Sequence, residues 1–259
     1  MLGAIAGDII GSVYEANPIK TKEFPLFDPR CRYTDDTVLT VALADAILHD
    51  KDYSQAMKSY VRRYPDAGYG GMFFRWAMSP GARPYHSFGN GAAMRISPAG
   101  WAFDSLEEVL EKATRFTEVT HNHPEGIKGA KATAAAVFLA RTGQSKEDIR
   151  SYIERTFQYD LSWTLDEIRP GYAFDGSCQG TVPQAIRSFL ESRDYEDAVR
   201  NAVSLGGDSD TLACIAGGIA EAHYGGVPRF IAEKAWETLD QDLKEVTLRF
   251  REKYVIRHA

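Results

Sequence analysis

Three segments of the sequence have helical spacing but are apolar almost all the way round. They are Thr37–His49, Gly129–Arg141 and Leu212–His223. The first is apolar at positions 38, 39, 41, 42, 43, 46 and 47, which is too broad a stripe for a helix with one face in water. Such helices must be enclosed by others, so the chain is constrained to a fold with a large helical core.

A fourth helical segment, Gly3–Ser12, carries glycines at positions 3, 7 and 11. Residues four apart lie on the same face of a helix, so one face of this segment is nearly bare. We therefore expect another helix to approach it closely.

The remaining helical segments are amphipathic and are expected to form an outer layer around the buried ones. No sustained alternation of the kind that a strand needs is present. No linker or change of composition divides the chain, which predicts one all-α domain over residues 1–259 with functional loops. The amphipathic segments are Leu106–Phe116, Lys146–Phe157, Val182–Ser192, Tyr195–Leu205 and Pro228–Lys253. The irregular segments are Asn17–Tyr33, Tyr64–Gly71, Met78–Ala99, Thr120–Gly126 and Trp163–Thr181.

The size of the chain supports a large core. A chain of 259 residues has an unfolded surface of roughly 42,000 Å², which should shrink to about 11,000 Å² on folding. This excludes a disordered chain, a disulfide-stapled scaffold and a fibrous repeat. No stretch approaches 18 apolar residues, so no membrane span is expected, and Asp8 interrupts the apolar N-terminus, which does not resemble a signal peptide.

The net charge and the cysteine content indicate which partners and which cellular compartment to expect. The net charge is −6, and no basic run is longer than Arg62-Arg63, so we expect no broad nucleic-acid surface. Cys31, Cys178 and Cys214 are odd in number and lack metal-type pairing. Reduced thiols in a cytoplasmic protein, and a monomer, are the expectation.

Two short acidic clusters are the candidate metal-binding and catalytic segments. Thr34-Asp35-Asp36-Thr37 lies at the start of the first buried segment, and Gly206-Gly-Asp-Ser-Asp-Thr211 lies immediately before the last. Helix capping alone is the plain alternative, because Asp and Thr satisfy free N–H groups at a helix start. One carboxylate suffices for a cap, however, and each cluster supplies two.

Four carboxylates near a low-dielectric core repel one another and are costly to bury. A hard divalent cation resolves both problems. Carboxylate and hydroxyl oxygens without Cys or His suit Mg²⁺, Mn²⁺ or Ca²⁺ rather than Zn²⁺. Four acids exceed what one Mg²⁺ usually takes, so a two-metal site is expected.

Glu15 is a further candidate acid. It follows Asp8 by seven residues, which places both on one face if the first helix continues that far. Asp8 would then support Glu15. The alternative is a polar end to the helix.

The chain resembles the ADP-ribosylglycohydrolase family in five segments that occur in the family order. They are Gly3-Ala-Ile-Ala-Gly-Asp-Ile-Ile-Gly-Ser-Val-Tyr-Glu15, Thr34-Asp-Asp-Thr37, Phe88-Gly-Asn-Gly-Ala-Ala-Met-Arg95, Thr120-His121 and Leu205-Gly-Gly-Asp-Ser-Asp-Thr211. The resemblance runs from residue 3 to about 226 and implies an orthogonal helical bundle of that family's type.

The resemblance also implies two Mg²⁺ ions, for which Mn²⁺ can substitute. Glu15 matches a glutamate on a mobile flap that contacts metal or substrate. Asp66 is the only acid in the loop before Tyr69 and is left unassigned as a further ligand. The implied metal ligands are Thr34, Asp35, Asp36, Asp208, Asp210 and Thr211.

The implied substrate site involves the glycine-rich loop. Phe88–Arg95 would cradle the diphosphate and ribose of ADP-ribose, since backbone N–H groups beside glycines are suitable anion donors. His121 matches a histidine that lies against the substrate. Trp163–Gly180 is expected on the acceptor side, with Ser177 or Cys178 touching substrate. The predicted substrate-binding residues are Ser87, Phe88, Gly89, Asn90, Gly91, Met94, His121 and Cys178.

The implied activity is hydrolysis of the bond between ADP-ribose and a modified acceptor, either a macromolecule or a small conjugate. Asp35 or Asp36 would position and deprotonate the water, and Glu15 would gate the site. We expect arginine as the acceptor, with serine, a nucleic-acid base and O-acetyl-ADP-ribose left open. The alternative is a non-catalytic ADP-ribose-binding or structural relative.

Overall fold

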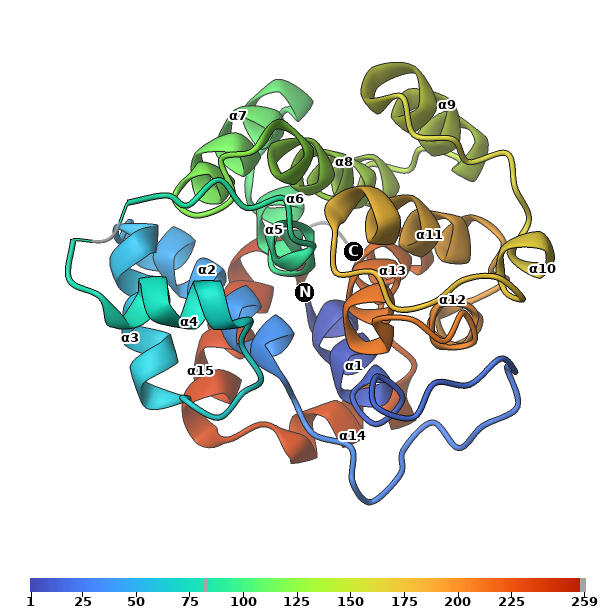
Figure 1. Cartoon of the computed structure of the whole chain (residues 1–259), viewed down its shortest axis with the longest axis horizontal. Helices are drawn as coiled ribbons and strands as arrows, with labels where there is room; N and C mark the ends of the chain where they lie inside the picture. Colours follow the sequence, from blue (N-terminus) through green and yellow to red (C-terminus); the bar gives the residue numbers. More distant parts are fainter. Residues whose placement is uncertain (82, 257–259) are drawn as a thin grey trace.

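The computed structural model describes residues 1–81 and 83–256 and is built from helices (Figure 1). Within these residues there is no strand, and a single isolated bridge pairs Gly89 with Ser177. The expectation of an all-α fold is confirmed. The helices are α1 (Leu2–Gly11), α2 (Asp35–His49), α3 (Tyr53–Arg63), α4 (Gly71–Met78), α5 (Gly91–Met94), α6 (Ser97–Ala102), α7 (Leu106–Glu118), α8 (Pro124–Arg141), α9 (Lys146–Phe157), α10 (Leu165–Ile168), α11 (Cys178–Leu190), α12 (Tyr195–Val203), α13 (Ser209–Tyr224), α14 (Arg229–Thr238) and α15 (Gln241–Phe250), and a π-turn over Arg251–Val255 follows.

The centre of the molecule is an antiparallel contact between α1 and α13 (Figure 1). A Cβ atom added to Gly3 would lie 2.4 Å from the carbonyl oxygen of Gly217, and one on Gly7 would lie 2.1 Å from that of Ala213. At Gly11 the nearest atom would be the carbonyl oxygen of Ser209, at 2.4 Å. The two backbones therefore touch along the whole of α1, and the predicted close approach is confirmed.

A buried ion cluster joins the far ends of these two helices. Glu221 on α13 accepts a 2.8 Å hydrogen bond from the backbone N–H of Gly3 and another of 2.8 Å from Arg251. It also pairs with the α-amino group of Met1. Although burial opposes ionisation, the two cations and the N–H donor keep the pKa of Glu221 below its usual value.

The three segments that the sequence predicts as enclosed helices are buried. In α13 every residue from Ser209 to Ala222 is buried, and α2 and α8 each have one short exposed end. The amphipathic helix α9 buries Ile149, Ile153 and Phe157, which are four residues apart. The total accessible surface is 10687 Å², as the chain length predicts.

Several boundaries differ from the sequence-based expectation. Helix α11 begins at Cys178 instead of Val182, because Ser177 caps it by accepting from Gly180. It packs against α8, α12 and α13 (Figure 1), and is therefore part of the core rather than the outer layer. The long C-terminal segment is divided between α14 and α15, since Asp240 caps a new helix.

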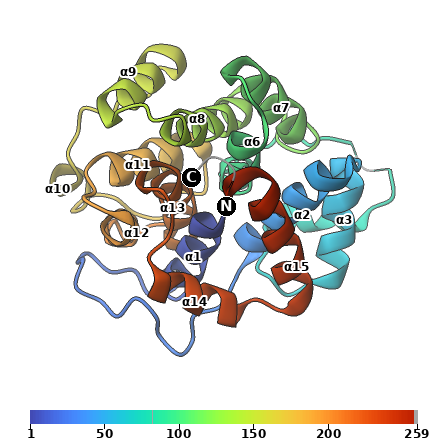
Figure 2. The same ribbon diagram turned by 180° about the vertical axis from the view of Figure 1, so that it is seen from behind.

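Helices α3 and α4 were not among the predicted segments. Helix α3 buries Tyr53, Ala56, Met57, Tyr60 and Val61, a helical pattern that the sequence contains. Figure 2 shows α15 lying across α2 on the back of the molecule, where it closes the core.

The segment between α1 and α2 is a long loop that carries Glu15 at its start (Figure 1). Its outer part is tied to α12, because Arg200 donates to the carbonyl oxygens of Lys22 and Phe24 at 2.9 and 2.8 Å. Lys22 also pairs with Asp197. The middle of this loop is therefore anchored to α12.

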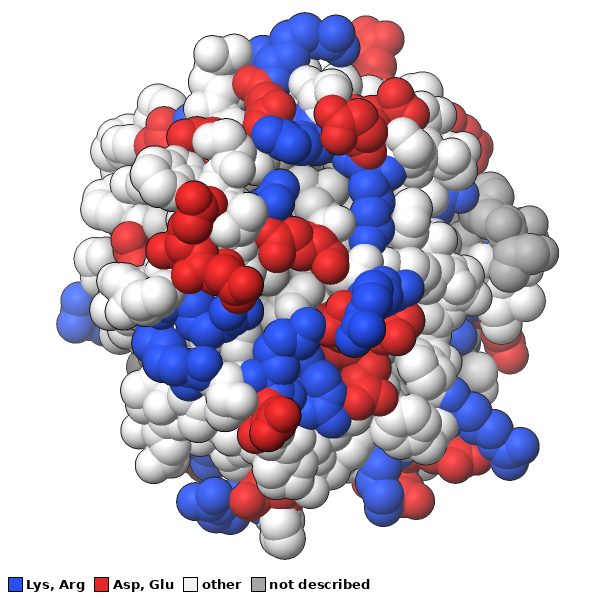
Figure 3. Space-filling view, turned by 90° about the vertical axis from the view of Figure 1, so that its right-hand side faces the viewer, with Lys and Arg blue, Asp and Glu red and all other residues white. Residues whose placement is uncertain are grey.

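Three further observations concern membrane-spanning helices, surface charge and the cysteines. None of the helices in the described part of the chain is long and apolar enough to cross a membrane. On the face shown in Figure 3, basic and acidic side chains are interspersed. Cys31, Cys178 and Cys214 are all free thiols.

The close contact between α1 and α13 predicts how a substitution at Gly7 changes the free energy of unfolding. Gly7→Ala should lower the free energy of unfolding by about 3 kcal/mol, because the added methyl group meets backbone atoms that cannot rotate away. Urea unfolding measures the change. Gly171→Ala is the matched control, since nothing lies within 4 Å of its added Cβ, and it should change stability by less than about 0.5 kcal/mol. Equal stabilities for the two variants would contradict the close contact.

Candidate functional site: an acidic cavity at three helix ends

The packing of α1 against α13 brings the two acidic clusters together. Because the helices are antiparallel, the start of α13 lies beside the end of α1, and Asp8 reaches the start of α2. Carboxylate oxygens of Asp8, Asp36 and Asp210 lie within 4.8 Å of one another. Oxygens of Glu15, Asp208 and Asp210 form a second such group, which shares Asp210 with the first.

Asp8 holds the start of α2 and does not share a helix face with Glu15. Its carboxylate accepts from the backbone N–H of Thr34 at 2.9 Å and of Thr37 at 3.1 Å, and from both threonine hydroxyls. Helix α1 ends at Gly11, so the predicted continuation to Glu15 is wrong. Asp8 is therefore a site residue whose partners the sequence did not reveal.

Helix capping, the plain alternative, explains the role of Thr34 but not the presence of the carboxylates. Thr34 is the N-cap of α2, and its hydroxyl accepts from the N–H of Asp36 at 3.3 Å. Asp208 occupies the N-cap position of α13 but makes no side-chain cap. The Oδ1 atom of Asp36 is buried and has no hydrogen-bond partner within the described residues.

An orphaned buried carboxylate oxygen is costly unless a cation binds it. The hydroxyl oxygens of Thr34 and Thr211 each lie 3.5 Å from Oδ2 of Asp36, so oxygen donors of two kinds converge at one point. Oxygen donors without sulfur or imidazole fit Mg²⁺ or Mn²⁺. The residues present therefore fit a divalent cation.

The electrostatics show the same concentration of negative charge. Burial, followed by repulsion from neighbouring carboxylates, raises the pKa of Asp36 and Asp210 well above the usual range. Burial and the charges of Asp8 and Asp208 raise the pKa of Asp35 to about 8. Burial raises the pKa of Asp8 to about 6, opposed by the hydrogen bonds from the two threonines. Burial and Asp208 also raise the pKa of Glu15.

The clusters open into a cavity of about 590 Å³. Glu15 and Asp35 line it from the more exposed side, whereas Asp36 is only 2% exposed. Asp66 is exposed outside the lining and is not placed as a ligand. Of the residues predicted from the sequence, the cavity is lined by Glu15, Thr34, Asp35, Asp36, Ser87, Gly89, Asn90, Gly91, Met94, His121, Asp208, Asp210 and Thr211.

The Gly89-Asn90-Gly91 loop connects to the second acidic cluster. The side-chain amide of Asn90 donates to Asp208 at 2.8 Å and to the hydroxyl of Thr181 at 3.1 Å. The backbone N–H of Asn90 donates to Gly176, and that of Gly89 donates to the hydroxyl of Ser87 at 3.1 Å. Two of the loop amides expected to bind phosphate are thus occupied, while the hydroxyl of Ser87 keeps a hydrogen to donate.

Two of the predicted substrate residues do not line the cavity. Cys178 lies beneath the loop, fully buried, where its thiol donates to the carbonyl oxygen of Gly89 at 3.2 Å. The structure places it as a support of the loop, so no contact of its side chain with substrate is expected. Phe88 is 48% exposed beside the cavity, and its ring meets His123 edge to face.

Sequence reasoning missed several lining residues. Arg32 and Arg75 add cationic side chains, and Tyr85 adds an aromatic one. Phe174 also lines the cavity, and it lies in the segment Trp163–Gly180 expected on the acceptor side. Arg95 also lines the cavity although only 1% of it is exposed. Arg95 lies within a matched motif, but only the fold shows which side chains its guanidinium meets.

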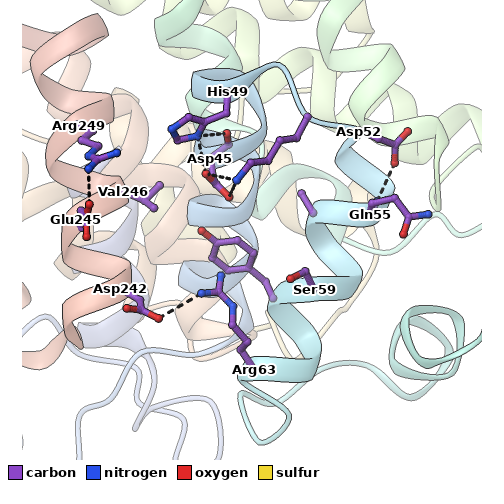
Figure 4. Close-up of a pocket in the computed structure, with 13 residues that line it drawn as sticks. Asp45, His49, Asp52, Gln55, Ser59, Arg63, Asp242, Glu245, Val246 and Arg249 are labelled. Atoms are coloured by element: carbon purple, nitrogen blue, oxygen red, sulfur yellow. Dashed lines mark hydrogen bonds and ion pairs between the residues drawn. The ribbon is translucent and has the colours of Figure 1, made fainter.

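A second cavity, of about 640 Å³, lies between α2, α3 and α15 (Figure 4). Its charged side chains are mostly paired with one another, as His49 and Lys51 are with Asp45, and Arg63 is with Asp242. No group of carboxylates of the kind seen around Asp36 forms there among the described residues. The acidic cavity is therefore the candidate active site.

The fold and the site define an all-α protein with an acidic cavity at converging helix ends, whose oxygen donors could hold a divalent cation. The family model "ADP-ribosylglycohydrolase" matches residues 1–256. The chain thus belongs to the ADP-ribosylglycohydrolase family.

Comparisons with individual proteins agree with this family assignment. The chain is 28% identical to ADP-ribosylhydrolase ARH3 of Mus musculus, over 87% of this chain and 82% of that protein. It is 26% identical to ADP-ribosylarginine hydrolase Tri1 of Pseudomonas putida, over 95% and 76% of the two chains. The solved structure of an ADP-ribosylglycohydrolase-related protein complex matches with a TM-score of 0.71 and 26% identity, covering 97% of this chain and 96% of that one. The protein is therefore an enzyme, a glycosidic-bond hydrolase of this family.

The raised carboxyl pKa values predict how a cation stabilises the fold at different pH. The pKa of Asp35 is about 8 and that of Asp8 about 6 in the folded state, and both are lower in the unfolded chain. Their protonation stabilises the metal-free fold below pH 4, and this contribution is lost as the pH rises towards 8. Cation binding requires ionised carboxylates. Mg²⁺ should therefore raise the Tm more at pH 8 than at pH 5.5.

Differential scanning fluorimetry with Mg²⁺ and with EDTA measures this difference at each pH. Asp36→Asn should abolish most of the Mg²⁺ effect, whereas Asp66→Asn should retain it. A shift in Tm that is the same at both pH values would count against a carboxylate site.

Proposed function

We propose that this enzyme is a dimetal-dependent hydrolase that cleaves the glycosidic bond between ADP-ribose and a modified arginine, releasing ADP-ribose. The observation that carries the proposal is the convergence of carboxylates from both acidic clusters, together with an Oδ1 atom of Asp36 that has no hydrogen-bond partner in the described part of the chain. The residues that would hold the two cations are Thr34, Asp35, Asp36, Asp208, Asp210 and Thr211.

Mg²⁺ is the proposed ion, with Mn²⁺ as a substitute, because all the donors are hard oxygen atoms. When bound, the cations would supply positive charge that keeps these carboxyls ionised and lowers the pKa of a nearby water molecule. Three unpaired thiols suit a reducing compartment, and we propose that the protein works in the cytoplasm as a monomer.

Asp35 is the best-placed proton acceptor. It lines the cavity, and its backbone N–H is held by the carbonyl oxygen of Ala67 at 2.8 Å, while its carboxylate has no side-chain partner among the described residues. Asp36 is enclosed between two threonine hydroxyls and is less accessible. Ionised Asp35 would orient a water molecule and accept its proton as the bond at C1″ of the ribose breaks.

Glu15 has a separate role at the entrance. Its side chain is exposed, and its carboxylate lies within 4.8 Å of those of Asp208 and Asp210. It stands near the start of the long loop whose middle is anchored to α12. A small movement of this short stretch would bring its carboxylate to the ribose or withdraw it. The carboxylates also stabilise the positive charge that develops on an oxocarbenium-like ribose.

The other part of the cavity suits the ADP moiety. Ser87 and His121 offer hydrogen-bond donors beside the glycine loop. Arg32 and Arg75 also line the cavity and add positive charge, with Arg32 near Glu15 at the acidic end. The predicted contact with His121 is thus supported by its position in the lining.

The choice of arginine as the acceptor rests on a named relative and not on the charge balance. When ionised, Asp8, Asp35, Asp36, Asp208, Asp210 and Glu15 carry six negative charges, which two divalent cations and the guanidinium groups of Arg32 and Arg75 in the cavity lining offset. The Tri1 relative is named as an ADP-ribosylarginine hydrolase, and we therefore propose the same acceptor here.

Removal of one ligand tests the mechanism. Asp36→Ala should lower kcat by about three orders of magnitude, because it removes the carboxylate at the centre of the cluster. Release of ADP-ribose is measured by chromatography, and circular dichroism checks the fold. Asp66→Ala, in an exposed loop outside the cavity, should retain wild-type activity. Undiminished turnover by Asp36→Ala would overturn the proposed site.

A substrate panel tests the acceptor. Peptides ADP-ribosylated on arginine or on serine, an ADP-ribosylated oligonucleotide and O-acetyl-ADP-ribose are each incubated with Mg²⁺, Mn²⁺ or EDTA. We expect the arginine peptide to be cleaved at least about tenfold faster than the others with either metal, and EDTA to stop the reaction. Faster cleavage of the serine peptide would refute the proposed acceptor while leaving the hydrolase assignment intact.

A further inference from the structure

Arg95 is a buried cation without a carboxylate partner. It follows α5 directly, only 1% of it is exposed, and it forms no ion pair with an acid in the described chain. Its guanidinium instead lies over the ring of Phe73, with its carbon 5.4 Å from the centroid, and near that of Tyr53, at 6.0 Å. Burying an arginine in this way is expensive, so its hydrogen bonds need an explanation.

Those hydrogen bonds converge on Thr120 and His121. The Nη2 atom of Arg95 donates to the hydroxyl oxygen of Thr120 at 2.6 Å and lies 3.3 Å from Nδ1 of His121. The hydroxyl of Thr120 lies 2.8 Å from the same Nδ1 atom. The three side chains form a closed, buried triangle behind the cavity.

The donors in this triangle determine where the imidazole proton sits. A guanidinium can only donate, so Nδ1 of His121 must accept from it. The hydroxyl of Thr120 already accepts from Arg95, which directs its own hydrogen towards Nδ1. An Nδ1 atom that accepts from both neighbours carries no proton, and a neutral imidazole must then carry its proton on Nε2.

The protonated atom faces the glycine loop. Nε2 of His121 lies 3.3 Å from the position that a Cβ atom on Gly91 would occupy and 3.5 Å from that on Gly89. Because both residues are glycines, no side chain from them fills the space beside Nε2. The ring of Tyr85 lies near that of His121, with the two centroids 5.9 Å apart, and it stays neutral because burial raises the pKa of Tyr85 to about 12.

We infer that Arg95 is a positioning residue, which together with Thr120 locks His121 in the neutral Nε2–H form as a permanent hydrogen-bond donor to the ADP-ribose oxygen that lies beside Gly89 and Gly91. His121 then has no role as an acid or a base. Burial and the charge of Arg95 also lower the pKa of His121 well below its usual range, which agrees with this arrangement. The inference rests on the proposed function, because it takes ADP-ribose as the occupant of the cavity.

Nitrogen-15 NMR of the imidazoles tests the tautomer without any substrate. The signal of His121 is assigned by its loss in His121→Asn. In the wild-type protein we expect the proton on Nε2, with no titration of this ring between pH 5 and pH 8. A proton on Nδ1, or titration near the usual histidine pKa, would overturn the inference whether or not the protein hydrolyses any substrate.

Two variants test the role of the triangle. Arg95→Met keeps an apolar chain against Phe73, and Thr120→Val keeps the shape of the threonine but removes its hydroxyl. Arg95→Met should let part of the imidazole population carry its proton on Nδ1 and should weaken ADP-ribose binding by roughly tenfold at pH 7, measured by calorimetry. In turnover by Arg95→Met, KM should rise more than kcat falls. Thr120→Val should keep the proton on Nε2, because Arg95 still donates to Nδ1.

The inference can still be tested if one of the variants does not fold. Should Arg95→Met fail to fold, the wild-type spectrum still decides the tautomer, and Thr120→Val still tests whether Arg95 alone holds it. An unaltered tautomer and an unaltered Kd in a folded Arg95→Met, or a proton on Nδ1 in a folded Thr120→Val, would refute the role of the triangle. Failure of the wild-type enzyme to release ADP-ribose from any substrate would instead refute the proposed function, with the imidazole spectrum unaffected.

Discussion

The structure depends on one contact, the approach of α1 to α13 backbone to backbone. Because Gly3, Gly7 and Gly11 lack side chains, the two helices lie closer together than any pair with side chains between them could. The start of α13 is thereby fixed beside the end of α1. Asp210 then has to lie next to Asp8, which in turn holds the start of α2.

This arrangement concentrates acids where they are least stable. Asp36 and Asp210 lie in protein of low dielectric with other carboxylates as neighbours, and their raised pKa values express that cost. The surrounding core, from α2 to α13, is rigid enough to hold the acids together. Stability given up at the site is offset by the burial of helices that are apolar on all sides.

The cavity has two chemically different parts. Acids gather at the ends of α1, α2 and α13, whereas Ser87, His121 and the glycine loop offer donors. Asn90 links the two, since it belongs to the loop and holds Asp208. A substrate with an anionic diphosphate at one end and a scissile ribose bond at the other matches this division.

The sequence by itself determined the helical class, the buried character of α2, α8 and α13, the bare face of α1 and the two acidic clusters. These features follow from local spacing and residue type, which the chain carries without reference to its fold. The family motifs also identified the glycine loop and His121. The extra lining residues Arg32, Arg75 and Tyr85 have no local signature.

Only the tertiary structure decided which side chains meet. Asp8 binds Thr34 and Thr37 rather than supporting Glu15, because α1 ends at Gly11 and the chain turns away. Cys178 supports the loop from below, because α11 begins four residues earlier than its apolar pattern indicates. Arg95 meets Thr120 and His121, which are 25 and 26 residues further along the chain. Partnerships of this kind depend on helix packing and chain direction, and no pattern within a single segment encodes them.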